Sequence, residues 1–442
     1  MNLSHINFKT DRHERYKDYE NMYNNYEDEW LQIRKFSNKI MHPYLAIALP
    51  REVATLYSDM AFAAPINAFA KDNPEADKAI DDIIEENNLD MMLSEASLTQ
   101  AYKGGIVFKN YLDNGVSKIT YIEPDFYFPV FSPTDKRKLI SETIAYPYQE
   151  GNRHYLYTET YEPRNGEYWV ISSTHVFQNN RIGKELTRNE VNTKLKESPL
   201  TYVPFIRSGS SFWGDSLYKA LTPLFDELNH RATQIADVLD RHSDPNMYAD
   251  PSFFEDNGEF ESGGKAYPVD HNAGEQPPGY ITFDWSAEWN FKFIEDIIFK
   301  ALSFVSPLAP ALYGMDEASQ ASGRALITKS WRTQCTVKRS HMYWRTALKK
   351  VLYIAQQLEV ISGKANYSPA IPNVELVLSL PMDNLENAQA EQLKVQSGIS
   401  SKKSAIARLN PHMNSKEVEE EFLEILNEQN EANKQNFMDD KW

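Results

Sequence analysis

The stretch LYKALTPLFDELNHRATQIADVL, residues 217–239, repeats apolar side chains at intervals of three and four residues. This spacing predicts an amphipathic helix, which Thr222-Pro223 can begin because proline is tolerated at the first helical position. A polar segment rich in Gly, Pro and Asp follows over residues 244–285. It is too long for an ordinary connection and predicts a small exposed β element. Apolar residues from Ile294 to Val305 then predict a returning helix.

The residues before this helix–β–helix unit fall into two regions with different sequence patterns. Residues 1–100 are predicted to be mainly helical, with amphipathic helices over Met22–Ile40 and Ile47–Met60 and a further helix starting near Pro74. Residues 104–205 alternate short runs rich in Val, Ile, Tyr, Phe and Thr with turn residues, which predicts an antiparallel β region. Its hairpin signals are Asp113-Asn114-Gly115 and Arg164-Asn165-Gly166, because Asn-Gly tolerates positive φ.

The residues after the unit are predicted to be mainly helical. A loop over residues 306–323 leads to a long helix from Arg324 to Ile361, which ends near Gly363. A short strand, Val374–Leu380, precedes about three C-terminal helices, the last with Asn414 and Glu417 as a capping pair. The predicted fold class is therefore α+β.

Composition narrows the class of protein. The chain has 442 residues, 41% of them hydrophobic, and 46 basic against 63 acidic residues give a net charge of −17. That profile is globular, and it disfavours sequence-specific DNA binding because phosphates attract positive charge. The single cysteine, Cys335, excludes internal disulfides and cysteine-based zinc sites, and it indicates a reducing compartment. A polar N-terminus predicts no signal peptide, and the most apolar stretch, Ile297–Tyr313, is too interrupted to span a membrane.

The charge is unevenly distributed. Between positions 324 and 350 there are eight basic residues and no acidic ones, and subtracting them from −17 leaves −25 on the rest of the chain. One interpretation is a helix that contacts a polyanion, with Trp331 and Trp344 as stacking partners. The favoured interpretation is a helix neutralised by acidic neighbours in the same or an adjacent subunit. The basic residues are Arg324, Lys329, Arg332, Lys338, Arg339, Arg345, Lys349 and Lys350.

Enzyme motifs are missing from the sequence. There is no P-loop, no H-E-x-x-H and no G-x-S-x-G. Asp240, His242, Asp244 and Asp250 form the best metal-like cluster and leave open a metal-dependent nuclease. They lie where a helix meets a turn, however, and polar residues are expected there in any protein. No catalytic residue, cofactor or metal is predicted.

Two further stretches, ASGRAL at residues 321–326 and GISSKKSAIARLNPHMNSKEVEEE at residues 398–421, complete the pattern. Together with the order of elements over about residues 40–430, they resemble the portal (head–tail connector) proteins of tailed double-stranded DNA phages. The first is similar to the S-G-x-A-L run that opens the long portal helix. The second is similar to the C-terminal pattern of a Gly-Ile-Ser start, a short helix, a proline and a Glu-rich helix.

The resemblance implies a portal fold with seven parts and a ring oligomer, commonly of twelve subunits. These parts are the wing (1–214), first stem helix (215–243), small α/β clip (244–290), second stem helix (291–305), tunnel loop (306–323), long wing helix (324–364) and a wing strand with the helical crown (365–442).

The resemblance also implies a non-enzymatic channel at one capsid vertex of the virion, assembled in the host cytoplasm. Double-stranded DNA passes through it during packaging and ejection. The terminase large subunit and a head-completion or adaptor protein dock on the clip, and the major capsid and scaffolding proteins surround the wing. The tunnel-loop candidates for DNA contact are Gly314, Met315, Asp316, Glu317, Ser319 and Gln320; weaker channel candidates are Lys292 and Lys300; docking candidates are Phe253, Phe254, Glu259, Lys265 and Tyr267.

The main alternative is another oligomeric phage scaffold that binds protein and not DNA. The two readings differ in assembly, because a portal forms closed rings with a hole wide enough for DNA.

Overall fold

The computed structural model divides into two compact units. One contains residues 1–20, 52–219 and 307–442, and the other contains residues 21–51 and 220–306. The seven-part division stays a prediction. The residues that the structure describes are 3–26, 45–243, 247–249, 266–268, 279–280, 291–306, 328–378, 384–410, 413 and 417–428.

Among the described residues, four helices precede the β region, and the first of them differs from the prediction. Helix α1 spans Asp11–Tyr23, and its chain leaves helical geometry at Asn25 and Tyr26, whose φ angles are 59° and 58°. The helix predicted over Met22–Ile40 was therefore wrong at its start, and residues 27–40 lie outside the described residues. Helices α3 (Leu49–Phe62), α4 (Pro74–Glu86) and α5 (Leu89–Lys103) follow. The predicted start at Pro74 is confirmed, with Asn73 accepting a hydrogen bond from Ala76 N.

A three-stranded antiparallel sheet follows α5. Its order is β3-β2-β9, with β2 at Gly105–Asp113, β3 at Val116–Ile122 and β9 at Leu200–Pro204. The predicted hairpin turn is confirmed, because Asn114 and Gly115 have φ angles of 49° and 79°.

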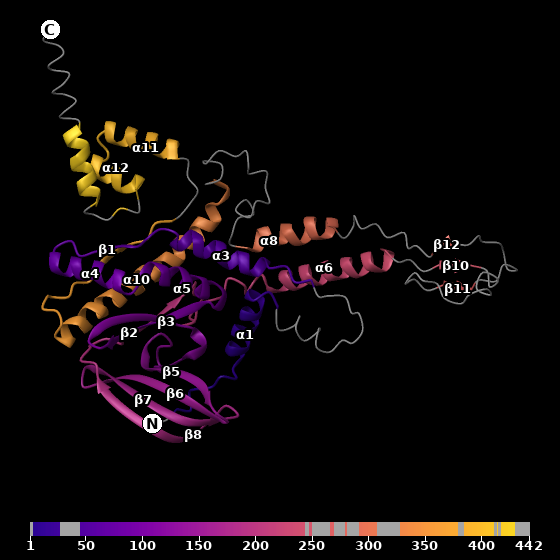
Figure 1. Ribbon diagram of the computed structural model, residues 1–442, viewed down its shortest axis with the longest axis horizontal. Helices are drawn as coiled ribbons and strands as arrows, with labels where there is room; N and C mark the ends of the chain where they lie inside the picture. The colour runs from indigo at the N-terminus through magenta and orange to yellow at the C-terminus, as the bar shows by residue number, and fades with distance from the viewer. Residues whose placement is uncertain are drawn as a thin grey trace, which may run out of the picture. The chain divides into compact units, whose positions relative to one another are not determined.

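A five-stranded antiparallel sheet lies beneath it in Figure 1. Its strands run in chain order: β4 (Tyr127–Phe131), β5 (Leu139–Glu150), β6 (Arg153–Arg164), β7 (Glu167–Gln178) and β8 (Arg181–Asn192). Asn165 and Gly166 turn between β6 and β7 with φ angles of 54° and 85°, as the sequence predicted. Asn179 and Asn180 make an equivalent turn before β8.

The two sheets share one apolar core. Alternate side chains point to one face of a strand, so Tyr127, Ile144 and Tyr161 of the larger sheet meet Val107 and Leu200 of the smaller one. The residues of opposite parity in the larger sheet form a second cluster with the N-terminal segment. That cluster contains Leu3, Ile6, Phe128, Ala145 and Leu156.

Helix α10 (Trp331–Ser362) packs across all three strands of the smaller sheet. It ends at Gly363, whose φ of 78° supplies the left-handed C-cap that the sequence predicted. Strand β13 (Asn373–Glu375) follows and pairs with β1 (Asn67–Phe69). This pairing joins residues about 300 positions apart in the same unit.

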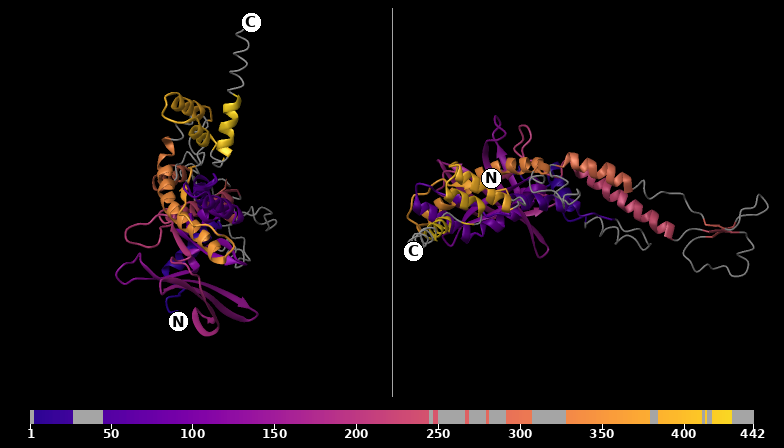
Figure 2. Two further views of the ribbon diagram at one scale, coloured as in Figure 1. Left: turned by 90° about the vertical axis from the view of Figure 1, so that its left-hand side faces the viewer. Right: turned by 90° about the horizontal axis from the view of Figure 1, so that it is seen from above.

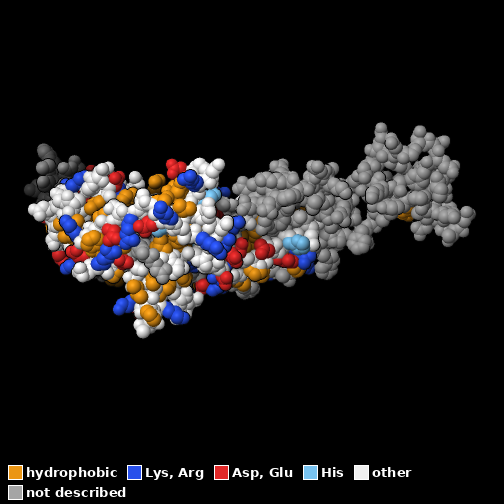
Figure 3. Space-filling view, turned by 90° about the horizontal axis from the view of Figure 1, so that it is seen from below, with side chains coloured by type: hydrophobic (Ala, Val, Ile, Leu, Met, Phe, Trp, Pro, Cys, Tyr) orange, Lys and Arg blue, Asp and Glu red, His pale blue; other side chains and the backbone are white. Residues whose placement is uncertain are grey.

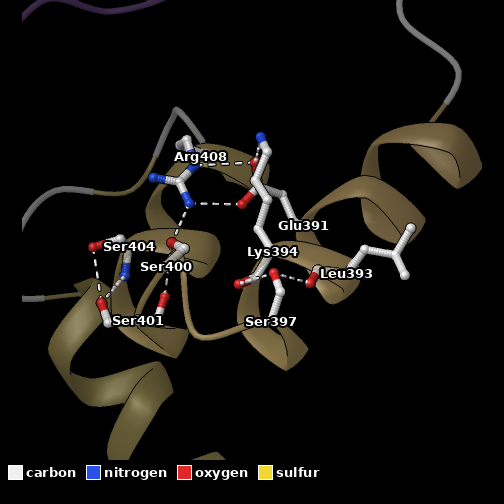
Figure 4. Close-up of polar contacts among 8 residues, drawn as sticks. All are labelled: Glu391, Leu393, Lys394, Ser397, Ser400, Ser401, Ser404 and Arg408. Carbon is white, nitrogen blue, oxygen red and sulfur yellow. Dashed lines mark hydrogen bonds and ion pairs between the residues drawn. The ribbon is translucent and has the colours of Figure 1, made fainter.

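Helices α11 (Asn384–Gln396) and α12 (Lys402–Leu409) form a hairpin near the C-terminus. Figure 4 shows Arg408 of α12 and Lys394 of α11 directed at the Glu391 carboxylate. Arg408 approaches it through Nε at 3.0 Å and a terminal nitrogen at 2.7 Å, and Lys394 Nζ lies at 2.7 Å. These ion pairs hold the pKa of Glu391 at about 2.

The second unit contains the helix–β–helix segment. Helix α6 spans Thr222–Ser243 and begins at the predicted Thr-Pro pair. The chain returns through η4 (Phe293–Phe299), which is π-helical, and α8 (Lys300–Val305). Both views place this return beside α6 (Figures 1 and 2). The predicted β element is confirmed as a three-stranded sheet of β10 (Met247–Ala249), β11 (Ala266–Pro268) and β12 (Gly279–Tyr280).

Candidate channel and docking segments

The helix pair of the second unit is held by apolar contacts and by one stacked cation. Ile235 on α6 and Ile298 and Leu302 on the return are buried. The Arg231 guanidinium lies 5.2 Å from the centre of the Phe293 ring, and its Nε donates to Glu227 Oε1 at 2.7 Å. The face of η4 and α8 that carries these contacts is turned toward α6, and the opposite face is available to other partners.

The two predicted channel lysines lie on that return. Lys292 and Lys300 are both exposed. Lys300 Nζ lies 2.6 Å from Asp296 Oδ1, one helical turn earlier. This hydrogen bond and charge lower the pKa of Asp296 and raise the pKa of Lys300. Lys300 is therefore locally neutralised, and Lys292 is the more available positive charge of the two.

The other predicted site residues are only partly described. Tyr267 lies on β11, opposite Tyr248 of β10. The remaining docking candidates and all tunnel-loop candidates lie outside the described residues. They are Phe253, Phe254, Glu259, Lys265, Gly314, Met315, Asp316, Glu317, Ser319 and Gln320.

The nuclease alternative rests on residues at the end of α6. Asp240 and His242 belong to this helix, whereas Asp244 and Asp250 lie outside the described residues. Among the residues that the structure describes, no group of three or more His, Cys, Asp or Glu side chains is arranged to hold a metal ion.

The basic helix is more deeply embedded than its sequence indicated. Trp344 is completely buried, and its Nε1 donates to Gln100 Oε1 at 2.9 Å. The prediction that Trp344 could stack on a ligand was therefore wrong, because its ring fills the core. Trp331 is 61% exposed, with Lys338 Nζ 5.7 Å from its ring centre.

Lys350 is half-buried on the same helix. Its Nζ donates to Leu200 O at 3.0 Å, and burial lowers its pKa although Glu142 and Glu197 oppose that shift. Acidic residues of the same subunit therefore compensate part of this helix's positive charge, as the favoured interpretation of a neutralised helix predicts. The remaining basic residues that lie exposed on the helix include Arg332, Lys338, Arg339 and Arg345.

A family model for phage portal proteins, described as SPP1 Gp6-like, matches residues 6–435. The chain belongs to this family. The resemblance found in the sequence is confirmed, and the chain is a structural protein of the phage portal class. No curated protein matches the sequence.

Solved structures of gene transfer agent (GTA) particles overlap weakly with this portal chain. The neck of an empty GTA particle, computed with C6 symmetry, has a TM-score of 0.47 and 12% identity, covering 83% of this chain and 91% of that one. The neck of a native GTA particle with C12 symmetry has a TM-score of 0.44 and 12% identity over 83% of this chain and 90% of that one. The virion of a native gene transfer agent (GTA) particle gives 0.41 and 11%, covering 82% and 89%.

Within the described residues of this portal chain, no helix is both long and apolar enough to cross a membrane.

Sequence reasoning missed a cavity of about 490 Å³ lined by α1, the end of α5 and residues 208–219. The sequence gives only a weak indication of this cavity: the three-residue spacing of Arg12 and Arg15, which places two cations on one side of a helix.

Proposed function

We propose that this protein forms a closed ring, commonly of twelve subunits in its family, at one vertex of the phage capsid. The single observation that carries the proposal is the portal family match over residues 6–435, nearly the whole chain. In this proposal the ring is a non-enzymatic channel of the virion. It assembles in the host cytoplasm, and double-stranded DNA passes through it during packaging and ejection.

Individual segments take separate roles in the proposed ring. Helix α6 and the η4–α8 return form the stem, and residues 306–323 form the tunnel loop that contacts DNA. The terminase large subunit and, later, a head-completion or adaptor protein dock on residues 244–290, the clip. The major capsid and scaffolding proteins surround the wing. The order of the described elements, helix, small sheet and returning helix, supports this assignment.

The charge distribution suits a channel whose cargo must move. On the described part of the face in Figure 3, Lys and Arg side chains are interspersed with Asp and Glu. A protein that holds DNA tightly presents several cations to consecutive phosphates. A net charge of −17 disfavours such retention, while cyclic symmetry multiplies each remaining cation, such as Lys292, into a ring of equal charges.

Negative-stain microscopy of the purified chain tests the proposal. We expect closed rings with a central hole wide enough for duplex DNA, and native mass spectrometry should give a single ring size. A chain that stays monomeric or dimeric at every concentration, also with scaffolding and capsid proteins present, would contradict the portal function.

Deletion of residues 315–320 tests the proposed tunnel loop. Rings should still assemble, because the deleted residues are predicted to face the channel, and DNA packaging measured as nuclease-protected DNA should fall. A deletion that abolishes ring formation instead would show that these residues belong to a subunit interface.

A further inference from the structure

The cavity of the first unit has walls that are fixed by backbone contacts. Gly214 N donates to Tyr202 Oη at 3.1 Å, and Phe205 N donates to Gly104 O at 2.9 Å. A Cβ atom on Gly214 would lie 2.2 Å from Gly104 O, so only glycine permits this approach. The segment that carries Trp213 is thereby held against the end of α5, opposite α1.

Two of the four cations that line the cavity are already neutralised. The Lys103 side chain is 1% exposed, and its Nζ lies 3.0 Å from Glu20, 2.6 Å from Glu123 and 3.0 Å from Asp125. Lys219 Nζ lies 2.7 Å from Asp215 Oδ1. Neither ammonium group is free to bind a new anion strongly.

Arg12 and Arg15 are different. Among the described residues, no carboxylate oxygen lies within 4.0 Å of either guanidinium group. Arg12 stacks on Trp213, with its Cζ 3.7 Å from the ring centre, and its buried Nε has no hydrogen-bond partner. Burial lowers the pKa of Arg12. A buried guanidinium without an anion is costly, since interior charges are normally paired.

The charges around the cavity select the class of anion. Four cations line the cavity, Arg12, Arg15, Lys103 and Lys219, together with one carboxylate, that of Asp215. Three further carboxylates, those of Glu20, Glu123 and Asp125, surround the Lys103 ammonium group. The site is therefore neutral as a whole and would not hold a polyanion such as DNA, which needs several uncompensated cations. Two guanidinium forks on one side suit a single carboxylate, which they bind with bidentate geometry.

We propose that Arg12 and Arg15 bind the carboxylate of an Asp or Glu side chain from a second copy of this chain, so that the cavity is a contact between neighbouring subunits. This inference rests on the ring of the proposed function. The chain's excess of acidic residues, 63 against 46 basic ones, supplies such carboxylates at high local concentration in any closed ring. A cavity of about 490 Å³ is large enough for one inserted side chain.

The first test compares assembly of full-length variants by native mass spectrometry over a range of concentrations. Arg15→Gln and the double variant with Arg12→Gln should raise the concentration at half-assembly about tenfold or more, because an unpaired carboxylate would be left buried. Arg181→Gln, an exposed cation on β8, is the matched control and should change nothing. Circular dichroism checks that the variants stay folded, and Arg15 is exposed enough to be replaced safely.

The outcomes separate the two proposals. If the unmodified chain forms no ring, the proposed function fails and this inference fails with it. If the unmodified chain and the Arg15→Gln variant assemble at the same concentrations, the inference alone is overturned.

A second test detects the contact directly. Carbodiimide couples an amine to a carboxylate without a spacer, so the Arg15→Lys variant gains a reactive amine in the cavity. Rings mixed from ¹⁵N-labelled and unlabelled variant chains should yield a cross-link from position 15 to an Asp or Glu of the other chain. Cross-links confined to the same chain, for example to Asp215, would overturn the inference.

Discussion

The first unit and the helix pair of the second unit are stabilised in different ways. In the first unit Gln100 is a buried hub: its Oε1 accepts from Tyr57 Oη at 3.1 Å and Trp344 Nε1 at 2.9 Å, and its Nε2 donates to Pro204 O at 3.1 Å. In the described part of the helix pair, the ion pairs join residues four positions apart on the surface, such as Lys300 with Asp296.

This difference in the kind of contact shows which interactions determine the structure of each region. Buried contacts between distant residues make the first unit a scaffold that one chain determines by itself. Exposed pairs within one helical turn contribute little, so the stability of the helix pair depends on its few buried apolar contacts, such as those of Ile298 and Leu302.

The largest expected effect is on the buried hub. Trp344→Ala should lower the free energy of unfolding of the first unit by about 3–5 kcal/mol, because it leaves a cavity and an unpaired Gln100 oxygen. Urea denaturation followed by circular dichroism measures this loss. Trp331→Ala, at the exposed start of the same helix, should cost less than about 0.5 kcal/mol. Equal losses would remove the distinction between hub and surface.

The second-largest effect on stability is expected where Gly214 packs against the backbone of Gly104. Gly214→Ala should lower stability by about 1–3 kcal/mol, since its Cβ would overlap Gly104 O and the backbone must shift. Gly209→Ala, where no atom lies within 4 Å of the new Cβ, should cost about 1 kcal/mol from its positive φ alone. Thermal melting compares the two variants, and a smaller loss for Gly214 would contradict the packing argument.

A smaller effect concerns pH and the α11–α12 hairpin. Ion pairs with Arg408 and Lys394 depress the pKa of Glu391 from 4.5 to about 2. A depressed carboxyl pKa contributes stability that is complete above about pH 4.5 and is lost as pH falls toward 2. Hydrogen-exchange protection of α11 and α12 should therefore decline below pH 4.5. Glu391→Gln should lack this decline, and an identical pH profile for both proteins would contradict the role of Glu391.

The smallest effect on stability is expected at the stem lysines. Lys300→Ala removes one exposed pair with Asp296, so the melting temperature should not change measurably. Lys292→Ala is the matched comparison, because its cation is exposed on the same return. In phage carrying either variant, packaging should respond more to Lys292→Ala than to Lys300→Ala. A drop in melting temperature for Lys300→Ala would show that local pairs matter more than this comparison assumes.

Local signals were readable from the sequence because each depends on a few neighbouring residues. Asn-Gly at 114–115 and 165–166 predicts its turn through positive φ, Gly363 predicts a helix end, and Thr222-Pro223 predicts a helix start. The order of elements then identified the portal family, which the family match over residues 6–435 confirms.

Tertiary structure alone decided which side chains meet. No spacing in the sequence indicates that Trp344 reaches Gln100, 244 positions away, instead of solvent. The same holds for the cavity, where Arg12 lies on Trp213 and Lys103 gathers Glu20, Glu123 and Asp125. Local propensity acts within a turn or two of the chain, whereas burial and pairing depend on how distant segments pack, and only the folded chain resolves that.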